Sequence, residues 1–137
     1  KFLTKNKIQV MGHIGLLPQS VKGKFKSQGK TDKEIKQLIY DAHLLEKSGV
    51  FAIVLECVKT SIAKKISKNL NIPTIGIGSS VHCDGQVLVT DDLLGLNETK
   101  IKFVKRFLNI KKYINMGLKK YALQVRSKKY PSKKYSY

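Results

Sequence analysis

An apolar run extends from Val50 to Val58 and carries one charged residue, Glu56, close to its end. Gly49 precedes this run and Lys59 follows it. A short apolar run with such boundaries predicts a strand that is buried on both faces of a parallel sheet. Parallel α/β folds place their reactive groups at the carboxyl ends of the strands, because the loops there form the open rim. Glu56 is therefore the first candidate for a functional side chain.

The chain before this run contains one predicted strand and one predicted helix. Lys7 to Leu17 predicts a strand that leads into a loop, with the regular pattern broken from Gly12 to Gly15. Pro18 to Lys30 carries turn residues and few apolar ones, which predicts a loop. Thr31 to Glu34 matches a capping box, so a helix begins there and Gly49 ends it. The apolar residues of this helix recur at helical spacing: Ile35, Leu38, Ile39, Ala42 and Leu45.

After the central run the pattern alternates again between helix and strand. An amphipathic helix begins near Thr60 or Ser61 and ends at Asn71. A third strand is predicted from Ile72 to Gly78 and a fourth from Gln86 to Val89. The resulting βαβαβ order predicts a parallel sheet with right-handed crossovers. Such a sheet is either an open α/β sheet or half of a (β/α)₈ TIM barrel, whose full length is about 250 residues. Periodicity leaves both open.

The last third of the chain is predicted to be helical and then irregular. Asp91 to Leu96 predicts a loop or a short helical turn, and helical patterns follow at Ile101 to Leu108 and at Ile114 to Val125. Residues 127–137 predict an irregular, exposed and basic tail. We expect residues 1–137 to be one domain or part of one domain.

Composition narrows the class of protein. With 137 residues, of which 42% are hydrophobic, the chain is long enough for a packed core. No apolar stretch reaches the roughly 20 residues that a membrane helix needs, and no charged-then-apolar leader is visible, which predicts a soluble protein without a membrane partner. Cys57 and Cys83 fall in different predicted elements, so neither a disulfide nor a CxxC metal site is indicated. These features favour a cytoplasmic setting.

The formal net charge of +18 suggests a nucleic-acid partner at first sight. The 39 residues after Glu98 hold 13 of the 27 Lys and Arg residues and no Asp or Glu. The excess is mostly Lys, and neither arginine-rich blocks nor RNA-binding aromatic motifs occur. We therefore favour a solvated basic surface over a specific nucleic-acid site.

Two residues are the leading candidates for chemistry. Glu56 at the end of a buried strand loses hydration, so its pKa should rise into the range that suits a general base. The alternative is a structural glutamate that caps a helix or pairs with Lys59. His13 lies at the end of the first predicted strand, between Gly12 and Gly15, which let a ligand approach the backbone. The residues alone leave open whether His13 binds a ligand or simply packs.

Four other motifs have weaker claims. Ile75 to Gly78 lacks the GxGxxG spacing of a phosphate-binding loop, so we interpret it as a strand. His82 to Asp84 has poor spacing for a metal site, and a loop with a turn at Asp84 and Gly85 is preferred. Asp91 and Asp92 fit helix capping better than cation binding. Cys57 is most simply a small buried residue.

Four blocks of the sequence, in order, resemble the signatures of one enzyme family. The blocks are Val10 to Leu16 followed by Pro18 to Ser20, then Val54 to Val58, Ile72 to Gly78 and Cys83 to Val89. Together they resemble ketopantoate hydroxymethyltransferase, also called 3-methyl-2-oxobutanoate hydroxymethyltransferase. The resemblance continues from Lys102 to Phe107 and into the Tyr-Pro-Ser tail, so it covers essentially the whole chain.

The resemblance implies an α/β fold that is the C-terminal half of a (β/α)₈ barrel of the phosphoenolpyruvate-binding type. Similar proteins transfer a one-carbon unit from 5,10-methylenetetrahydrofolate to 3-methyl-2-oxobutanoate, which yields 2-dehydropantoate for pantothenate and coenzyme A. Glu56 matches the family's proton acceptor. His13 matches a histidine of the substrate pocket, and the Val89 backbone amide matches a contact to the substrate carboxylate. Mg²⁺ stabilises the enolate in this family, and its ligands are expected in the N-terminal half rather than in this chain. Homo-oligomers are usual.

Three departures from the family pattern stand out. The loop from Val21 to Gly29, around Gly23, is shorter, Ser79 and Ser80 replace a small Ala-Gly pair, and Asp91 stands where a histidine is common. The N-terminal half is expected to be missing, so the isolated chain should show no hydroxymethyl transfer. Two alternatives stay open, namely a basic nucleic-acid-binding module and another ketoacid lyase of the same barrel superfamily.

Overall fold

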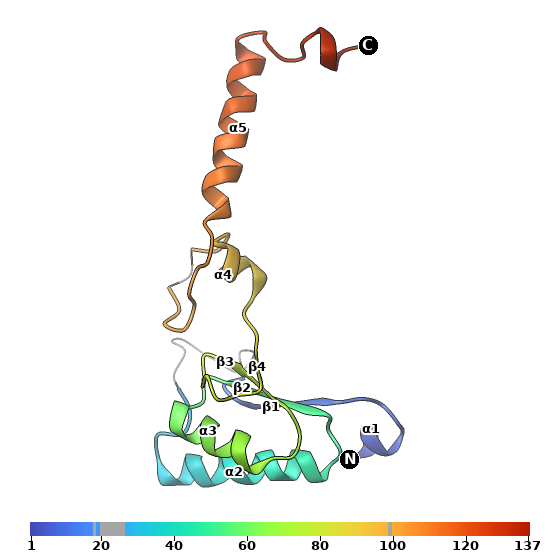
Figure 1. Ribbon diagram of the computed structural model, residues 1–137, viewed down its shortest axis with the longest axis vertical. Helices are drawn as coiled ribbons and strands as arrows, with labels where there is room; N and C mark the ends of the chain where they lie inside the picture. Colours follow the sequence, from blue (N-terminus) through green and yellow to red (C-terminus); the bar gives the residue numbers. More distant parts are fainter. Residues whose placement is uncertain (18, 20–26, 99) are drawn as a thin grey trace. The chain divides into compact units, whose positions relative to one another are not determined.

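Four strands and two long helices make up the first part of the chain (Figure 1). The structure is a computed structural model of residues 1–137 and describes all of them except 18, 20–26 and 99. By their contacts the residues form two compact units, 1–88 with 101–103 and 89–100 with 104–137. The elements of the first unit are α1 (Phe2–Lys5), β1 (Met11–Gly15), α2 (Asp32–Lys47), β2 (Ala52–Glu56), α3 (Thr60–Asn69), β3 (Thr74–Ile77) and β4 (Gly85–Gln86).

The strands form one sheet in the order β1-β2-β3-β4, and every neighbouring pair is parallel. This confirms the predicted βαβαβ series, with α2 linking β1 to β2 and α3 linking β2 to β3. In the register, Gly15 lies opposite Glu56, and Glu56 lies opposite Ile77. The carboxyl ends of three strands therefore meet at one rim of the sheet, with Glu56 in the middle.

Helices α2 and α3 lie on the same face of the sheet, and the hydrophobic core fills the space between (Figure 1). The central strand β2 contributes Ile53 and Leu55, both 0% exposed, as expected for a buried strand. The other buried side chains of this core are Ile14, Leu38, Ala42, Val50, Val58, Ala63, Ile66 and Cys83. Successive residues of a strand point to opposite faces, so Val54 and Glu56 point away from the helices. We call this side the opposite face; it carries Met11, His13, Val54, Glu56, Ile75 and Ile77.

Local sequence sets the limits of α2 as predicted. The Thr31 hydroxyl accepts a hydrogen bond from the Glu34 backbone N–H at 3.2 Å. The Glu34 carboxylate reaches back to the backbone N–H groups of Lys30 and Gly29, and these bonds lower its pKa. Ser48 caps the other end, and Gly49 follows with a φ of 83°, a conformation that glycine adopts without strain.

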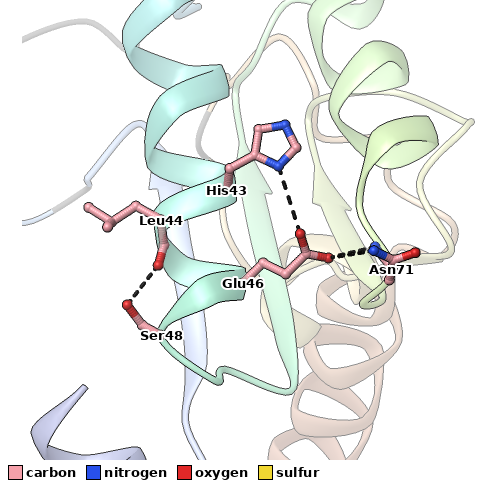
Figure 2. Close-up of polar contacts among 5 residues, drawn as sticks. All are labelled: His43, Leu44, Glu46, Ser48 and Asn71. Carbon is pink, nitrogen blue, oxygen red and sulfur yellow. Dashed lines mark hydrogen bonds and ion pairs between the residues drawn. The ribbon is translucent and has the colours of Figure 1, made fainter.

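A polar contact joins the end of α2 to the turn before β3. Figure 2 shows the Glu46 carboxylate between two partners. It accepts a bond from the Asn71 backbone N–H at 2.6 Å, and its other oxygen lies 3.7 Å from Nδ1 of His43. Beside it, the Ser48 hydroxyl donates to the carbonyl of Leu44. The contact ties the end of α2 to the turn between α3 and β3.

The structure corrects three predicted elements in the first 108 residues. β1 occupies Met11–Gly15, where the sequence indicated a broken pattern. Glycine is compatible with this strand where a neighbouring side chain occupies the space that a side chain of its own would fill. At Gly12 this neighbour is Leu45, whose Cδ1 would lie 2.9 Å from an added Cβ. The predicted fourth strand is confirmed, but its bounds differ: β4 covers Gly85–Gln86 instead of Gln86 to Val89. After it only Val87 still bonds to the sheet, through the carbonyl of Gly76.

The predicted helix from Ile101 to Leu108 is wrong, because tertiary contacts hold this segment in a non-helical path. In the first unit the Phe103 ring packs directly on Gly78, where an added Cβ would lie 2.5 Å from the ring. In the second unit the Phe107 backbone N–H donates to the carbonyl of Leu93 at 2.9 Å. The loop predicted from Pro18 to Lys30, with its shortened part around Gly23, lies in part outside the described residues.

The second unit contains the helices α4 (Thr90–Leu94) and α5 (Ile110–Arg126) and a short 3₁₀ turn (Lys133–Tyr135). α4 agrees with the predicted helical turn, and α5 contains the whole predicted pattern from Ile114 to Val125. The Asn109 side chain caps α5 by accepting from the Lys112 N–H at 3.3 Å. Residues 127–137 are all exposed. Among the described residues, no helix is long and apolar enough to span a bilayer.

Candidate active site

Glu56 is the last residue of β2 and points to the opposite face of the sheet. It is 8% exposed, although it is a charged residue type. Burial raises the pKa of this carboxyl group, because the ionised form loses hydration. The charge of His13 acts in the other direction and is the smaller influence. A buried carboxylate with a raised pKa at a strand end has the properties of a general base.

His13 stands beside Glu56 on the neighbouring strand. Its Nε2 lies 3.3 Å from Glu56 Oε2, and the two side chains are 33% and 10% exposed. The register explains the pairing: Gly15 is opposite Glu56, and His13 is two residues earlier, so both side chains project from the same face. The pair can accept a proton at the carboxylate and hydrogen-bond an oxygen of a ligand at the imidazole.

Gly15 lets β1 approach the carbonyl of Glu56 closely. A Cβ on Gly15 would lie only 2.2 Å from that oxygen, and the φ of Gly15 is 98°. The next residue, Leu16, donates its backbone N–H to the same oxygen at 2.9 Å. The glycine therefore allows the backbone at the end of β1 to pack against the backbone of Glu56. This contact fixes the ends of the two strands that carry His13 and Glu56.

The turn after Glu56 is held from both neighbouring segments. Cys57 has a φ of 53°, in the left-handed region that non-glycine residues rarely adopt. Its N–H donates to Ile77 O at 2.9 Å, and its carbonyl accepts from Gln28 at 2.8 Å. Ser79 reaches the turn from the segment after β3 and bonds to both backbone groups of Val58. These bonds keep the strained turn in place.

A cavity of about 380 Å³ opens beside β1, between this strand and the first half of α2. His13 and Gly15 line one side, and the α2 side chains Lys33, Gln37 and Asp41 line another. His13 is among the residues that line this cavity, whereas Glu56 is not, so the cavity lies beside the pair on the side of α2.

Val89, the third predicted site residue, belongs to the second unit. It is the residue before α4, is 53% exposed, and its carbonyl accepts from the Leu93 N–H. The structure thus brings His13 and Glu56 together and describes Val89 separately. The sequence marked Ser79 only as a departure from the family pattern and gave no role to it. The sequence feature that could have indicated its contact with the turn is a hydroxyl side chain directly after Gly78, next to the end of β3.

The weaker motifs have structural partners. Ile75 to Gly78 begins within β3, as predicted. Asp84 lies in the predicted loop, where its carboxylate accepts from the N–H and hydroxyl of Thr74, which lowers its pKa. Asp92 is buried in α4 and accepts from the Asn97 side chain at 3.1 Å. Cys57 is buried, as predicted, and burial, followed by the charge of Glu56, raises the pKa of its thiol.

The chain is similar in sequence to known proteins of one kind. Residues 1–133 match the family model described as ketopantoate hydroxymethyltransferase. A 3-methyl-2-oxobutanoate hydroxymethyltransferase of Pelagibacter ubique is 58% identical over 137 residues, which are 100% of this chain and 53% of the relative. Enzymes of the same name from Clostridium botulinum (strain 657 / Type Ba4) and Buchnera aphidicola are 49% and 46% identical, each over 140 aligned residues that cover 100% of this chain and 51% and 53% of the relatives.

The chain therefore spans about half the length of the curated relatives that it matches. The match extends over nearly all of its own residues, including both members of the His13–Glu56 pair. The chain belongs to the ketopantoate hydroxymethyltransferase family.

Proposed function

We propose that this chain is the C-terminal half of a 3-methyl-2-oxobutanoate hydroxymethyltransferase of pantothenate biosynthesis. The reaction adds a one-carbon unit from 5,10-methylenetetrahydrofolate to 3-methyl-2-oxobutanoate and gives 2-dehydropantoate. The observation that carries the proposal is the pairing of buried Glu56 with His13 at the carboxyl ends of β1 and β2. Family membership supports the choice of reaction. Four parallel strands with α2 and α3 on one face are consistent with half of a (β/α)₈ barrel.

Glu56 is proposed as the base that removes the proton from C3 of the ketoacid, next to the ketone. This proton is weakly acidic, so the base needs a pKa above that of an exposed glutamate, and burial supplies that rise. The carbanion formed at C3 is delocalised onto the ketone oxygen as an enolate. C3 then bonds to the methylene carbon of the folate, and water adds the hydroxyl oxygen to the same carbon. The two bonds from this carbon to N5 and N10 of the folate break, the two nitrogens take up one proton from C3 and one from water, and tetrahydrofolate leaves.

His13 and Val89 are proposed to bind the ketoacid. The His13 imidazole is partly exposed beside Glu56, so it can orient a substrate oxygen next to the base. The Val89 backbone N–H is proposed to contact the substrate carboxylate on the ground of the family resemblance alone. A homo-oligomer in the cytoplasm is proposed from the family resemblance.

Magnesium is the ion that the family implies, and carboxylate oxygens are its usual protein ligands. Among the described residues, no group of three or more His, Cys, Asp or Glu side chains is placed to hold a metal ion. Glu56, the carboxylate at the rim, is already paired with His13. The described side chains do not fit a magnesium site by themselves, and we derive no step through the ion. Its ligands are expected in the part of the family's length that this chain does not span.

The decisive experiment uses a chimaera in which this chain replaces the segment that it matches in the Pelagibacter ubique relative. We expect the chimaera to form 2-dehydropantoate from both substrates and to form none when 5,10-methylenetetrahydrofolate is left out, which separates this reaction from that of a ketoacid lyase. We expect no product from the isolated 137-residue chain. A folded chimaera that forms no product, under conditions in which the parent relative is active, would refute the proposed function.

The pH dependence of the chimaera gives a second prediction. The base must be ionised, so kcat/KM should rise with pH through the pKa of Glu56. Burial raises that pKa, so the rise should occur above about pH 4.3, where an ordinary glutamate titrates. His13→Gln removes the charge that opposes the shift, and the rise should then move to higher pH. A pH–rate profile of both proteins measures this, and an unchanged or lower midpoint in the variant would contradict the coupling.

A further inference from the structure

We propose that Asp84 is a positioning residue that fixes β4 against β3 and so places the segment that leads to Val89. The two strands are parallel, and the seven residues 78–84 connect them without a helix. Parallel neighbours need a crossover of about a dozen residues or more, which is usually a helix such as α2 or α3. A shorter crossover lacks the packing that a helix supplies, so specific bonds must replace it.

The Asp84 carboxylate bonds to the first residue of β3. Its Oδ2 accepts from the Thr74 backbone N–H at 2.8 Å and from the Thr74 hydroxyl at 2.9 Å. These two bonds, of which the backbone bond has the larger effect, lower the pKa of Asp84. Gly76, two residues later on the same edge of β3, accepts from the Val87 N–H. The carboxylate therefore takes the place of a first backbone pair between β3 and β4.

The two residues that follow fit the same role. Gly85 pairs with Ile75, and a Cβ on Gly85 would lie 2.9 Å from Ile75 Cδ1, so glycine permits the close approach. The Gln86 side chain donates to the Ser80 carbonyl at 2.8 Å and so closes the connection on itself. This contact uses a backbone carbonyl and does not depend on the side chain at that position. The block from Cys83 to Val89 thus contains the residues that hold a short crossover in place.

The position of β4 matters for the proposed function, on which this inference rests in that it takes the Val89 N–H as the contact for the ketoacid carboxylate. Val87, directly after β4, donates to the Gly76 carbonyl at 3.0 Å. Gly76 precedes Ile77, which lies opposite Glu56. A slip of β4 by one residue would move the chain by about 3.3 Å and turn its side chains to the other face. The segment that leads to Val89 would then no longer present the same N–H to the substrate.

The test compares three variants of the full 137-residue chain. Asp84→Ala removes the carboxylate, and Asp84→Asn keeps one oxygen that can accept both bonds. Glu46→Ala is the matched control, because the Glu46 carboxylate also accepts a backbone N–H, that of Asn71 in the turn before β3. The three variants therefore separate loss of the contact to Thr74 from loss of a carboxylate in general.

Two kinds of measurement apply. Hydrogen exchange at the amides of Thr74 and Val87 reports whether β3 and β4 stay paired, and the core amides of β2 are the reference for global unfolding, namely Ile53 and Leu55. The nuclear Overhauser effect (NOE) between the Gly85 α protons and the Ile75 δ methyl group reports the register. In the chimaera, kcat and the KM for 3-methyl-2-oxobutanoate are measured separately. A substitution that only destabilises the protein lowers the apparent kcat through the amount of folded enzyme and leaves KM unchanged.

For Asp84→Ala we expect exchange at Thr74 and Val87 to become roughly 10- to 100-fold faster, the change that follows from losing a hydrogen bond to a charged group. The NOE should weaken or disappear. In Asp84→Asn the NOE should persist and exchange should be about three- to tenfold faster, because neutral hydrogen bonds are about half as strong. Glu46→Ala should leave both amides and the NOE unchanged. In the chimaera, Asp84→Ala should raise the KM for the ketoacid by roughly 10- to 100-fold, since the contact that is displaced also involves a charged group.

Exchange at Thr74 and Val87 that rises only in step with Ile53 and Leu55, or an unchanged NOE in Asp84→Ala, would overturn the proposal. If Asp84→Ala does not fold, faster exchange confined to Thr74 and Val87 in Asp84→Asn supports the proposal, and exchange that changes at all four amides or at none overturns it. A chimaera that is inactive, although the amides and the NOE respond, refutes the proposed function and leaves the role of Asp84 in placing β4. An active chimaera in which Asp84→Ala leaves KM unchanged refutes the positioning role.

Discussion

Replacing Glu56 with glutamine in the chimaera is expected to lower kcat by roughly 10²- to 10⁴-fold, the range that a positioned general base contributes. Glutamine has nearly the shape of glutamate but does not accept the C3 proton. The side chain is buried next to His13, so the substitution removes the acceptor without removing its bulk. Steady-state turnover, together with deuterium uptake at C3 of the ketoacid in heavy water, measures the loss at the proton-transfer step.

The control for this substitution is Glu46→Gln, the same chemical change at a glutamate outside the candidate site. Glu46 binds Asn71 at the far end of α2, and its substitution should leave kcat unchanged (Figure 2). Stability gives an independent readout. The folded state raises the pKa of Glu56, so its ionised form costs stability at pH values above the folded pKa. Glu56→Gln should therefore unfold at a higher urea concentration at neutral pH. Deuterium uptake at the parental rate would show that another group is the base.

Gly15→Ala is expected to destabilise the chain by about 2–5 kcal/mol, the sum of an unfavourable backbone conformation and overpacking. The new Cβ would lie 2.2 Å from the Glu56 carbonyl oxygen, and a φ of 98° is unfavourable for alanine. The backbone must move, and the bond from the Leu16 N–H to Glu56 must lengthen or break. Urea unfolding measures the free-energy change, and hydrogen exchange at Leu16 reports the local effect.

Gly117→Ala is the matched control, since it adds the same methyl group where there is room. Apart from the adjacent residues and the backbone of its own helix turns, nothing among the described residues lies within 4 Å of a Cβ at this position, which is inside α5. Alanine should stabilise the helix by about 0.5–1 kcal/mol, because glycine has the larger entropy loss on folding. If Gly15→Ala is as well tolerated as Gly117→Ala, the close approach of β1 to Glu56 is not a constraint on the fold.

The sequence was most informative where one local property decided the structure. The apolar run around Ile53 predicted the central strand, and the capping signal at Thr31 predicted the start of α2. The alternation of elements predicted the parallel sheet. It was least informative where glycines or aromatic residues met distant parts of the chain. Gly12 belongs to β1 because the Leu45 side chain lies over it, and Phe103 packs on Gly78 where a helix was expected.

By itself, the sequence determined that Glu56 ends a buried strand, because an apolar run requires burial on both faces and a single charge marks its end. It also showed the family signatures, although it left the function of His13 open. Only the tertiary structure decided that the imidazole lies 3.3 Å from that carboxylate and that Ser79 holds the turn beside it. Strand register and contacts between segments 19 to 43 residues apart create these distances, and no local pattern encodes them.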